Sequence, residues 1–333
     1  SVQLVKKTNT GENLGGWQIG LYTDAACTNS VSGSPFTTGA DGTVTVSGLQ
    51  KGTYYAKEIS TDDPYWEFDT AVKSVTIAVG KTAEVTFTNT HYGRIEIRKT
   101  TNTGNQLGGW TFRVRDSEGN SYGDFTTDEN GYACTQNLPL GWYTVVELPT
   151  EDNYWLTELG FHDVTVKAGE TTVDTWLNKE QGLVWFYKKT NTGQSVEGWH
   201  ITVYSDEACT QKVGTLITNA DGKAGYYLDP GIYWAKETGD EHGRFEDEYW
   251  MVDETVHKFE IKPHEDVSIT FTNVQYGRLK ISKTVEGGGS VEGWQFKITD
   301  AEGKVLDGSP FASNKDGIIL TGNLLPGQYT VEE

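Results

Sequence analysis

The sequence predicts an all-β protein made of tandem small antiparallel β-sandwiches arranged as an elongated rod. Aromatic residues make up 12% of its 333 residues, and 39 glycines stand beside 8 prolines, a composition that favours short strands joined by tight turns. Long stretches with helical periodicity are absent. Four times, a strand that ends in lysine runs through a glycine-bearing turn into a tryptophan, which indicates a repeat protein.

The four copies of this motif define four domains. They begin LVKKTNTGENLGGW, IEIRKTTNTGNQLGGW, VWFYKKTNTGQSVEGW and LKISKTVEGGGSVEGW, and they contain Lys6 and Trp17, Lys99 and Trp110, Lys188 and Trp199, and Lys283 and Trp294. The lysines are 93, 89 and 95 residues apart, which is too long for a solenoid coil and fits small independent domains. We predict repeat 1 at residues 1–92, repeat 2 at 93–181, repeat 3 at 182–276 and repeat 4 at 277–333, the last without its closing strand.

Each domain begins directly after the one before it. Gly93, Gly182 and Gly277 open repeats 2, 3 and 4, each four residues after an asparagine, and no Gly/Ser-rich or Pro-rich linker intervenes. Joints this short favour a stiff connection, whereas a flexible linker would let the domains move independently. This is the basis for predicting a rod.

The strands of a repeat follow from two-residue alternation. The first strand places Val2, Leu4 and Lys6 on one face, which we expect to be the core face. Hairpin turns are predicted where Gly, Asn or Asp clusters occur, at residues 39–42, 128–131, 219–222 and 314–317. By the same alternation, Glu58 on a later strand and Asn89 on the closing strand also point inward.

One lysine, one glutamate and one asparagine recur at these inward positions in every complete repeat. The sets are Lys6, Glu58 and Asn89; Lys99, Glu147 and Asn178; and Lys188, Glu237 and Asn273; repeat 4 has Lys283 and Glu333 alone. Burying an unpaired charge is costly. A buried salt bridge would account for the lysine and the glutamate but would leave the recurrent asparagine unexplained.

A self-made isopeptide bond would require all three residue types. An apolar setting lowers the pKa of a lysine, which supplies neutral amine as a nucleophile, and raises the pKa of a glutamate. The protonated glutamate would then donate a hydrogen bond to the carbonyl oxygen of the asparagine and carry protons as ammonia leaves. The salt bridge and the isopeptide bond are the two interpretations of the set.

The segments GRIEIRKTTNTGNQLGGWTFRV, TTDENG, LPLGWYTVVE and TWLN resemble the collagen-adhesin B-type, or SpaA-like, domains of Gram-positive surface proteins. The resemblance spans the three complete repeats and most of the fourth, and it implies a prealbumin-like, inverse immunoglobulin-like sandwich. By motif position it also implies three cross-links, each assisted by a glutamate: Lys6 to Asn89 with Glu58, Lys99 to Asn178 with Glu147, and Lys188 to Asn273 with Glu237.

The sequence departs from the family pattern at two places. A tryptophan follows the first turn, where the family more often carries a small residue ahead of an aromatic, so packing near the lysine is expected to differ. Asp174 stands in repeat 2 where Val85 and Ile269 stand in the sister copies. We expect this extra carboxylate to hold Lys99 charged.

The resemblance implies the stalk of a cell-surface adhesin or the shaft of a pilin. The location would be the cell-wall-attached surface of a Gram-positive bacterium, with the anchor signal outside this sequence. We expect no enzymatic activity beyond single-turnover self-cross-linking. The expected partners are neighbouring domains of a longer surface protein and, through flanking regions, a host surface protein or glycan.

Repeated aromatic pairs suggest an alternative function. The segments DPYW, DNYW and DEYW contain Tyr65 and Trp66, Tyr154 and Trp155, and Tyr249 and Trp250. Exposed aromatic rings beside acidic residues would form a platform for a host glycan or protein, which would make the chain a ligand-binding adhesin region. The other interpretation is that the rings cap the open end of each sandwich, which their presence in every complete copy favours.

Composition argues against several other classes of protein. With 47 acidic and 27 basic residues the net charge is −20, which disfavours nucleic acid or an anionic membrane as a partner, and no apolar run is long enough for membrane insertion. Three cysteines cannot form a disulfide framework. The six histidines lack metal-binding spacing and are interpreted as surface residues, so we expect no metal and no cofactor.

Overall fold

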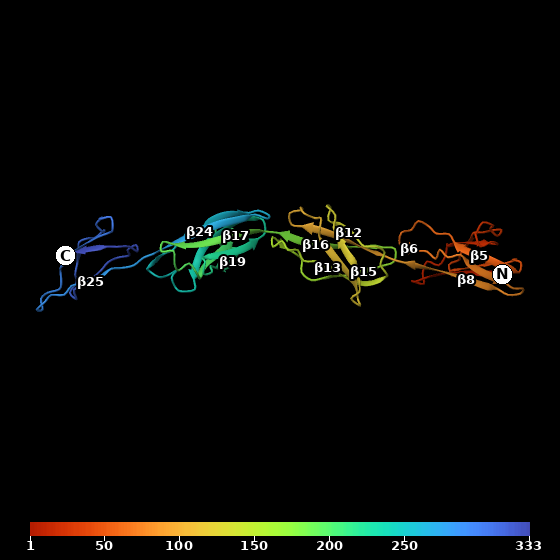
Figure 1. Ribbon diagram of the computed structural model, residues 1–333, viewed down its shortest axis with the longest axis horizontal. Helices are drawn as coiled ribbons and strands as arrows, with labels where there is room; N and C mark the ends of the chain where they lie inside the picture. Colours follow the sequence, from red (N-terminus) through yellow and green to blue (C-terminus); the bar gives the residue numbers. More distant parts are fainter. The chain divides into compact units, whose positions relative to one another are not determined.

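The computed structural model describes all 333 residues, and its regular elements are β-strands (Figure 1). The chain divides into two compact units, Ser1–Glu151 with Thr157–Lys179, and Asp152–Leu156 with Glu180–Glu333. Most of repeats 1 and 2 lies in the first unit, and repeats 3 and 4 lie in the second. The structure contains no helix with the length and hydrophobicity that a membrane crossing requires.

Repeat 1 is a sandwich of two four-stranded sheets. Its strands are β1 (Val2–Thr8), β2 (Gln18–Tyr22), β3 (Phe36–Thr37), β4 (Thr43–Val46), β5 (Gly52–Glu58), β6 (Trp66–Glu67), β7 (Lys73–Ile77) and β8 (Ala83–His91). The sheet orders are β4-β1-β8-β6 and β3-β2-β5-β7. The first and last strands of the repeat, β1 and β8, are therefore neighbours in the same sheet.

Repeats 2 and 3 reproduce this arrangement. The strands of repeat 2 are β9 (Arg94–Thr101), β10 (Thr111–Asp116), β11 (Ser121–Thr126), β12 (Tyr132–Cys134), β13 (Gly141–Glu147), β14 (Trp155–Leu156), β15 (His162–Val166) and β16 (Thr171–Glu180). Those of repeat 3 are β17 (Gly182–Thr190), β18 (Trp199–Tyr204), β19 (Lys212–Ile217), β20 (Lys223–Leu228), β21 (Gly231–Asp240), β22 (Trp250–Met251), β23 (His257–Ile261) and β24 (Asp266–Gln275). In both repeats the second sheet has matching orders, β11-β10-β13-β15 and β19-β18-β21-β23.

Repeat 4 has two smaller sheets. Its strands are β25 (Lys280–Ser282), β26 (Gln295–Thr299), β27 (Phe311–Ala312), β28 (Ile318–Leu320) and β29 (Thr330–Glu332). β25 pairs with β28, and β26 lies between β27 and β29. The prediction of an all-β fold built from tandem sandwiches is confirmed.

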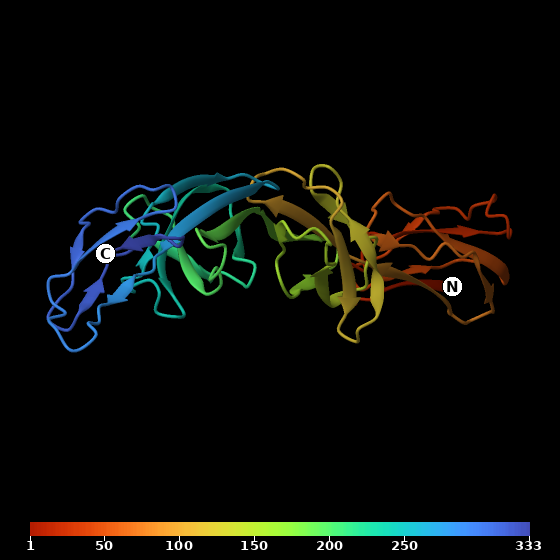
Figure 2. The same cartoon turned by 60° about the vertical axis from the view of Figure 1, so that its left-hand side comes forward.

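The first and last strands of each complete repeat lie side by side and run parallel, as β17 and β24 do in Figures 1 and 2. β1 pairs with β8 so that Thr8 lies opposite Asn89, and β9 pairs with β16 in the same way. This pair departs from the antiparallel pairing that the sequence predicted, which the neighbouring pairs such as β1 with β4 follow. The parallel pairing is possible because nearly the whole repeat connects the two strands, and parallel neighbours need a long crossover.

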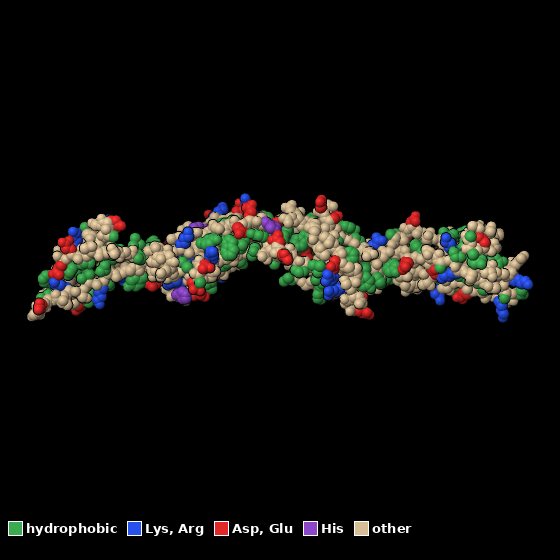
Figure 3. Space-filling view, viewed as in Figure 1, with side chains coloured by type: hydrophobic (Ala, Val, Ile, Leu, Met, Phe, Trp, Pro, Cys, Tyr) green, Lys and Arg blue, Asp and Glu red, His purple; other side chains and the backbone are tan.

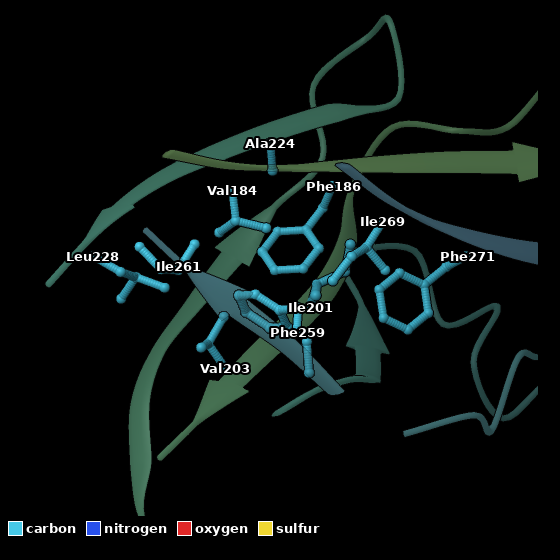
Figure 4. Close-up of a cluster of buried hydrophobic side chains, with 11 residues drawn as sticks. Val184, Phe186, Ile201, Val203, Ala224, Leu228, Phe259, Ile261, Ile269 and Phe271 are labelled. Atoms are coloured by element: carbon cyan, nitrogen blue, oxygen red, sulfur yellow. The ribbon is translucent and has the colours of Figure 1, made fainter. Parts of the chain in front are cut away.

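The core of each repeat is formed by alternate residues of both sheets. In repeat 3, Val184 and Phe186 of β17 point toward Ile201 of β18 and Phe259 of β23 (Figure 4). All four side chains are buried. Because successive strand residues point to opposite faces, this alternation also turns Lys188, two positions after Phe186, toward the interior.

The surface of the protein carries mixed charges. Figure 3 shows Asp and Glu side chains interspersed with Lys and Arg on the visible face, without a large region of one sign. On this face the 47 acidic and 27 basic residues of the chain therefore form no patch of one sign for a strongly charged partner.

The predicted hairpin turns lie directly against the lysine of each repeat. In repeat 2, Gly131 has a positive φ of 78°, and its carbonyl oxygen accepts a hydrogen bond from the backbone N–H of Lys99 at 2.7 Å. A Cβ on Gly131 would lie 2.4 Å from the carbonyl oxygen of Lys99. The turn thus requires glycine both for its conformation and for close approach to the first strand.

We predict that Gly131→Ala destabilises repeat 2 by about 1–3 kcal/mol more than a matched substitution, because it adds a backbone clash to the strain of a positive φ. The matched control is Gly104→Ala, since Gly104 has a φ of 72° and no atom lies within 4 Å of the position that its Cβ would take. Calorimetric transition temperatures of the two variants would be compared. Equal shifts would show that the close approach has no energetic role.

Candidate cross-linking site

The sandwich brings Lys6, Glu58 and Asn89 of repeat 1 into contact. Lys6 on β1 and Asn89 on β8 belong to neighbouring strands of one sheet, and Glu58 on β5 reaches them from the facing sheet. The Nζ atom of Lys6 donates to both carboxylate oxygens of Glu58 at 2.8 Å, and Nδ2 of Asn89 donates to Oε1 at 2.7 Å. The exposed fractions are 1%, 4% and 0%, so the predicted inward direction agrees with the structure.

Repeat 2 has the same arrangement at equivalent positions. Nζ of Lys99 donates to Oε1 of Glu147 at 2.7 Å, and Nδ2 of Asn178 donates to the same oxygen at 2.9 Å. Lys99 and Asn178 are buried at 2% and 0% exposure. One carboxylate oxygen therefore touches both the amine and the amide nitrogen.

Repeat 3 brings the same three groups together. Nζ of Lys188 forms an ion pair with Oε1 of Glu237 at 2.6 Å, and both side chains are fully buried. The side chains of Lys188 and Asn273 act on the Glu237 carboxyl group as hydrogen-bond donors, which opposes the effect of burial on its pKa. The charges of this pair are buried, which makes the cluster costly as a purely structural feature.

The tryptophan after the first turn covers the lysine of each repeat. Nζ lies 4.4 Å from the ring centroid of Trp17 in repeat 1, 4.7 Å from that of Trp110 in repeat 2 and 4.4 Å from that of Trp199 in repeat 3. The indole N–H of Trp17 donates to the carbonyl oxygen of Asn13 at 2.6 Å, which fixes the ring. The ring keeps solvent from the amine, and its face also attracts the charged form of the lysine.

Burial shifts the acid-base equilibria of the set. Desolvation lowers the pKa of Lys6 and Lys99 although the neighbouring glutamates oppose it, and it lowers the pKa of Lys188 to about 8. Burial also raises the pKa of Glu237 against the effect of Lys188. These directions favour the neutral amine in all three repeats and the neutral acid in repeat 3, as expected for an apolar setting.

The asparagine carbonyl has a different partner from the one we predicted. The backbone N–H of Asp69 donates to Oδ1 of Asn89 at 2.8 Å, that of Glu158 to Asn178 at 3.0 Å and that of Asp253 to Asn273 at 2.7 Å. The glutamate therefore faces the amide nitrogen and not the carbonyl oxygen. Sequence reasoning missed these three acidic residues, although each lies twenty positions before its asparagine, a spacing that could have revealed them.

Asp174 does not act on Lys99 as we predicted. Its Oδ1 lies 2.7 Å from Nδ1 of His162, and its Oδ2 accepts a hydrogen bond from the indole N–H of Trp176 at 2.8 Å. The carboxylates that raise the pKa of Lys99 are those of Glu147 and Glu158. The charge of Asp174 is compensated by its own partners.

The interpretation of the histidines as ordinary surface residues does not hold throughout, as His91 and His162 show. His91 is 8% exposed, and its ring stacks on Trp66 at a centroid distance of 3.8 Å. His162 stacks on Trp176 at 3.9 Å. Both rings therefore belong to the packing around the asparagine-bearing strand of their repeat.

A known domain family matches the chain along nearly its whole length. The family model described as SpaA, a prealbumin-like fold domain, matches residues 1–91, 93–180, 184–275 and 277–333. The chain belongs to this family. The match recurs four times, once in each of the repeats that carry the lysine motif, so we refer to them as SpaA-type repeats.

Several solved structures are similar to the chain of SpaA-type repeats. The Bacillus anthracis TIE protein is 19% identical, with 99% of this chain and 67% of that chain covered and a TM-score of 0.36. A streptococcal ancillary pilin is 16% identical (81% and 98% covered, TM-score 0.31), and BcpA, the major pilin subunit of Bacillus cereus, is 12% identical (82% and 99% covered, TM-score 0.34). No curated protein matches the chain.

The aromatic pair of the first SpaA-type repeat has partners within the protein. Trp66 packs edge-on against Trp17 at 5.1 Å and face-on against His91. The hydroxyl group of Tyr65 lies 2.6 Å from Oγ1 of Thr171 in repeat 2. Both rings therefore contribute to internal packing, which favours capping over a free ligand platform.

The pair in repeat 3 behaves similarly. Trp250 packs edge-on against Trp199, the ring that covers Lys188, at 5.4 Å. The guanidinium group of Arg278 lies 4.7 Å from the centroid of Tyr249. The pair thus joins the covering tryptophan of one repeat to the first residues of the next.

Tyr154 and Trp155 also have internal partners. The hydroxyl group of Tyr154 donates to Oδ1 of Asp266, and its ring lies 5.0 Å from that of His264. Trp155 is 9% exposed and approaches the same histidine ring at 5.6 Å. All three aromatic pairs are therefore part of the packing of the repeats.

Repeat 4 presents a more open version of the set. Lys283 forms an ion pair with Glu333 and lies 3.9 Å from the centroid of Trp294, but the side chain of Glu333 is 44% exposed. No group of three or more His, Cys, Asp or Glu side chains is placed to hold a metal. Cys27, Cys134 and Cys209 are free thiols.

We predict that His162→Gln destabilises repeat 2 more at about pH 5.5 than at about pH 9. Burial opposes the charge of His162, but the hydrogen bonds and charges of Asp174 and Glu158 outweigh it and raise the pKa. A raised folded pKa contributes stability that is fully present below the unfolded value near 6.5 and is lost as the pH rises through the folded pKa. Calorimetry at both pH values measures the effect, which should be roughly 5 °C at the lower pH.

The control for this prediction is His242→Gln, because His242 is exposed in repeat 3. It should change the transition temperature equally little at both pH values. A pH-independent loss in His162→Gln would mean that the ring contributes by packing on Trp176 and not by its charge.

Proposed function

We propose that this chain is a structural region of a Gram-positive surface protein, the stalk of an adhesin or the shaft of a pilus, and that its complete repeats cross-link themselves. The cross-links are isopeptide bonds from Lys6 to Asn89, from Lys99 to Asn178 and from Lys188 to Asn273. The observation that supports them is the same buried contact of amine, carboxylate and carboxamide in three repeats. The SpaA-type family assignment supports the surface role.

A simple salt bridge explains this geometry less well. Two buried charges gain little stability over apolar side chains of the same size, since desolvation offsets their attraction. Conversion to an amide, with the glutamate left protonated, would remove both buried charges, so the bonded state would relieve the cost of burial.

The reaction would proceed by proton transfers through the glutamate. In repeat 1, the Glu58 carboxylate takes a proton from the Lys6 ammonium, and the amine attacks Cγ of Asn89 to form the new C–N bond. Glu58 then gives its proton to Nδ2, which leaves as ammonia when the old C–N bond breaks. It regains a proton from the new amide nitrogen and ends protonated, so the only loss is one ammonia molecule.

The position of the glutamate suits this relay. Oε1 of Glu58 lies within 2.8 Å of Nζ of Lys6 and within 2.7 Å of Nδ2 of Asn89, the nitrogen that must be protonated to leave. Oε1 of Glu147 has the same two contacts in repeat 2. No movement of the acid is needed between the two proton transfers.

The bond would give the repeat stability and resistance to force. It joins the first strand to the last and closes a loop of 83 residues in repeat 1, which is worth roughly 4–5 kcal/mol in the chain-entropy description. Tension applied to β1 would pass to the parallel β8 through a covalent link without separating the sheet. The three free cysteines form no disulfide that would serve this purpose.

The remaining parts of the proposal concern context. We propose the repeat boundaries given by the sequence, residues 1–92, 93–181, 182–276 and 277–333, with the neighbouring domains of a longer surface protein as partners. The location would be the extracellular, cell-wall-attached surface. The chain would act on itself once and would not turn over a substrate.

We predict that the intact protein is three ammonia molecules lighter than its sequence requires, and that the combined variant Glu58→Ala, Glu147→Ala and Glu237→Ala has its full sequence mass. Removing the acids removes the proton relay. The matched control substitutes three exposed glutamates, Glu12, Glu118 and Glu207, and should keep the lower mass. Intact-mass spectrometry decides, and a wild-type protein at full sequence mass would refute the proposed cross-links.

We predict a bell-shaped pH dependence for the rate of bond formation in repeat 3. The reactive pair of neutral amine and protonated acid holds one proton in total, as does the ion pair. The pair loses this proton as the pH rises through about 8, the pKa of Lys188, and then no longer contains the reactive form. The rate should fall about tenfold per pH unit above this value. Timed quenching followed by peptide mass mapping measures it, and a rate that keeps rising above about pH 9 would exclude a required acid.

A further inference from the structure

Three acidic residues hold the asparagines of the complete repeats, and we call them clamp residues: Asp69, Glu158 and Asp253. Each lies twenty positions before its asparagine. The backbone N–H of each donates to the side-chain carbonyl oxygen, at 2.8, 3.0 and 2.7 Å. The three repeats differ widely in surface sequence, yet this contact is the same in all of them.

The clamp contact fixes the orientation of the carboxamide. A backbone N–H needs an acceptor, and of the two ends of an asparagine side chain the oxygen alone can accept. Oδ1 of Asn89 must therefore face Asp69, and Nδ2 must face Glu58, as it does at 2.7 Å. In the opposite orientation Nδ2, itself a donor, would face the N–H of Asp69. It would then point away from Glu58, although it is the nitrogen that must leave.

The side chain of the clamp residue makes a second contact to the same strand. The carboxylate of Asp69 accepts the backbone N–H of Thr88 at 3.2 Å, that of Glu158 accepts Leu177 at 3.0 Å and that of Asp253 accepts Thr272 at 3.1 Å. In each repeat the donor is the residue directly before the asparagine. The clamp residue is thus attached to the closing strand at two adjacent points, and this holds its N–H in place.

A basic residue four positions later compensates the clamp carboxylate. Lys73 forms an ion pair with Asp69, and His162 forms one with Glu158; His257 has the equivalent position in repeat 3 and its charge acts on Asp253. Without this compensation a second anion would face each reactive lysine, because Asp69 acts on the pKa of Lys6 in the direction that favours its charged form.

We propose that the backbone N–H of the clamp residue is the oxyanion donor of the cross-linking reaction, and that the clamp carboxylate is a positioning residue for that N–H. This inference rests on the proposed function. As the lysine amine adds to Cγ, negative charge develops on Oδ1, and the N–H at 2.7–3.0 Å already points at that atom. A donor fixed before the reaction stabilises this charge without reorganisation.

The direct test removes one N–H. Asp69 is replaced by its α-hydroxy-acid analogue during cell-free synthesis, which turns the N–H into an ester oxygen and keeps the side chain. The matched control is the same replacement at the neighbouring Thr70, because the N–H that contacts Asn89 belongs to Asp69. Samples are quenched at successive times and digested, and mass spectrometry measures the cross-linked fraction of each repeat separately.

The ester at residue 69 should slow bond formation in repeat 1 by about 100-fold or more, which is typical of the loss of one oxyanion donor. Repeats 2 and 3 of the same molecules, and repeat 1 of the control, should react at the wild-type rate. A wild-type rate in repeat 1 of the residue-69 ester would overturn the inference. Failure of the unmodified repeats 2 and 3 to cross-link would instead overturn the proposed function.

A second set of variants tests the carboxylate. Asp69→Ala should slow repeat 1, whereas Asp69→Asn, which keeps an oxygen that can accept the N–H of Thr88, should restore most of the rate. A purely electrostatic role would not separate them in this way, because both variants remove the same charge. Equal rates for the two variants would overturn the positioning role, and this readout remains decisive if the ester destabilises repeat 1.

Discussion

The burial of a lysine amine between two sheets is the constraint on which the rest of each repeat depends. An amine at 1% exposure needs a partner inside the protein, because burying an unpaired charge is costly. Glu58 supplies it in repeat 1, and the covering ring of Trp17 excludes water. The glycine turn that receives the N–H of the lysine holds its strand in place, so local turn chemistry serves the same centre.

Parallel pairing of the first and last strands converts this local contact into a property of the whole repeat. Thr8 lies opposite Asn89, so Lys6, two residues earlier on the same face, lies diagonally across one strand pair from the asparagine, and both contact Glu58. If these two strands were antiparallel, the two side chains could still meet, but the chain would enter and leave the repeat at the same end. In the parallel arrangement a link at this point connects the entry and the exit of the repeat.

The sequence predicted those parts of the site that follow from the alternation of side chains along a strand and from the recurrence of residue types among the repeats. Alternation along strands predicted that Lys6, Glu58 and Asn89 point inward, and repetition distinguished them from incidental polar residues. It was insufficient for contacts made by the backbone, because the acidic residue twenty positions before each asparagine is visible in the sequence but the N–H that makes the contact is not. Asp174 shows the same limit: its charge was visible in the sequence, but its compensation by His162 and Trp176 depends on rotamers and on a neighbouring strand.

In the proposed reaction, the clamp residue and the glutamate would act on different atoms of the asparagine side chain: the backbone N–H on the carbonyl oxygen and the carboxyl group on the nitrogen. If the glutamate had to polarise the carbonyl oxygen as well as protonate the nitrogen, one carboxyl group would need to serve two atoms of the same amide in succession. In the proposed reaction the backbone N–H would take the first task, so Glu58 and Glu147 could stay between the amine and the leaving nitrogen. Aspartate and glutamate would then be interchangeable as clamp residues, as Asp69 and Glu158 illustrate, because the main chain would make the reacting contact and the side chain would only have to reach the next strand.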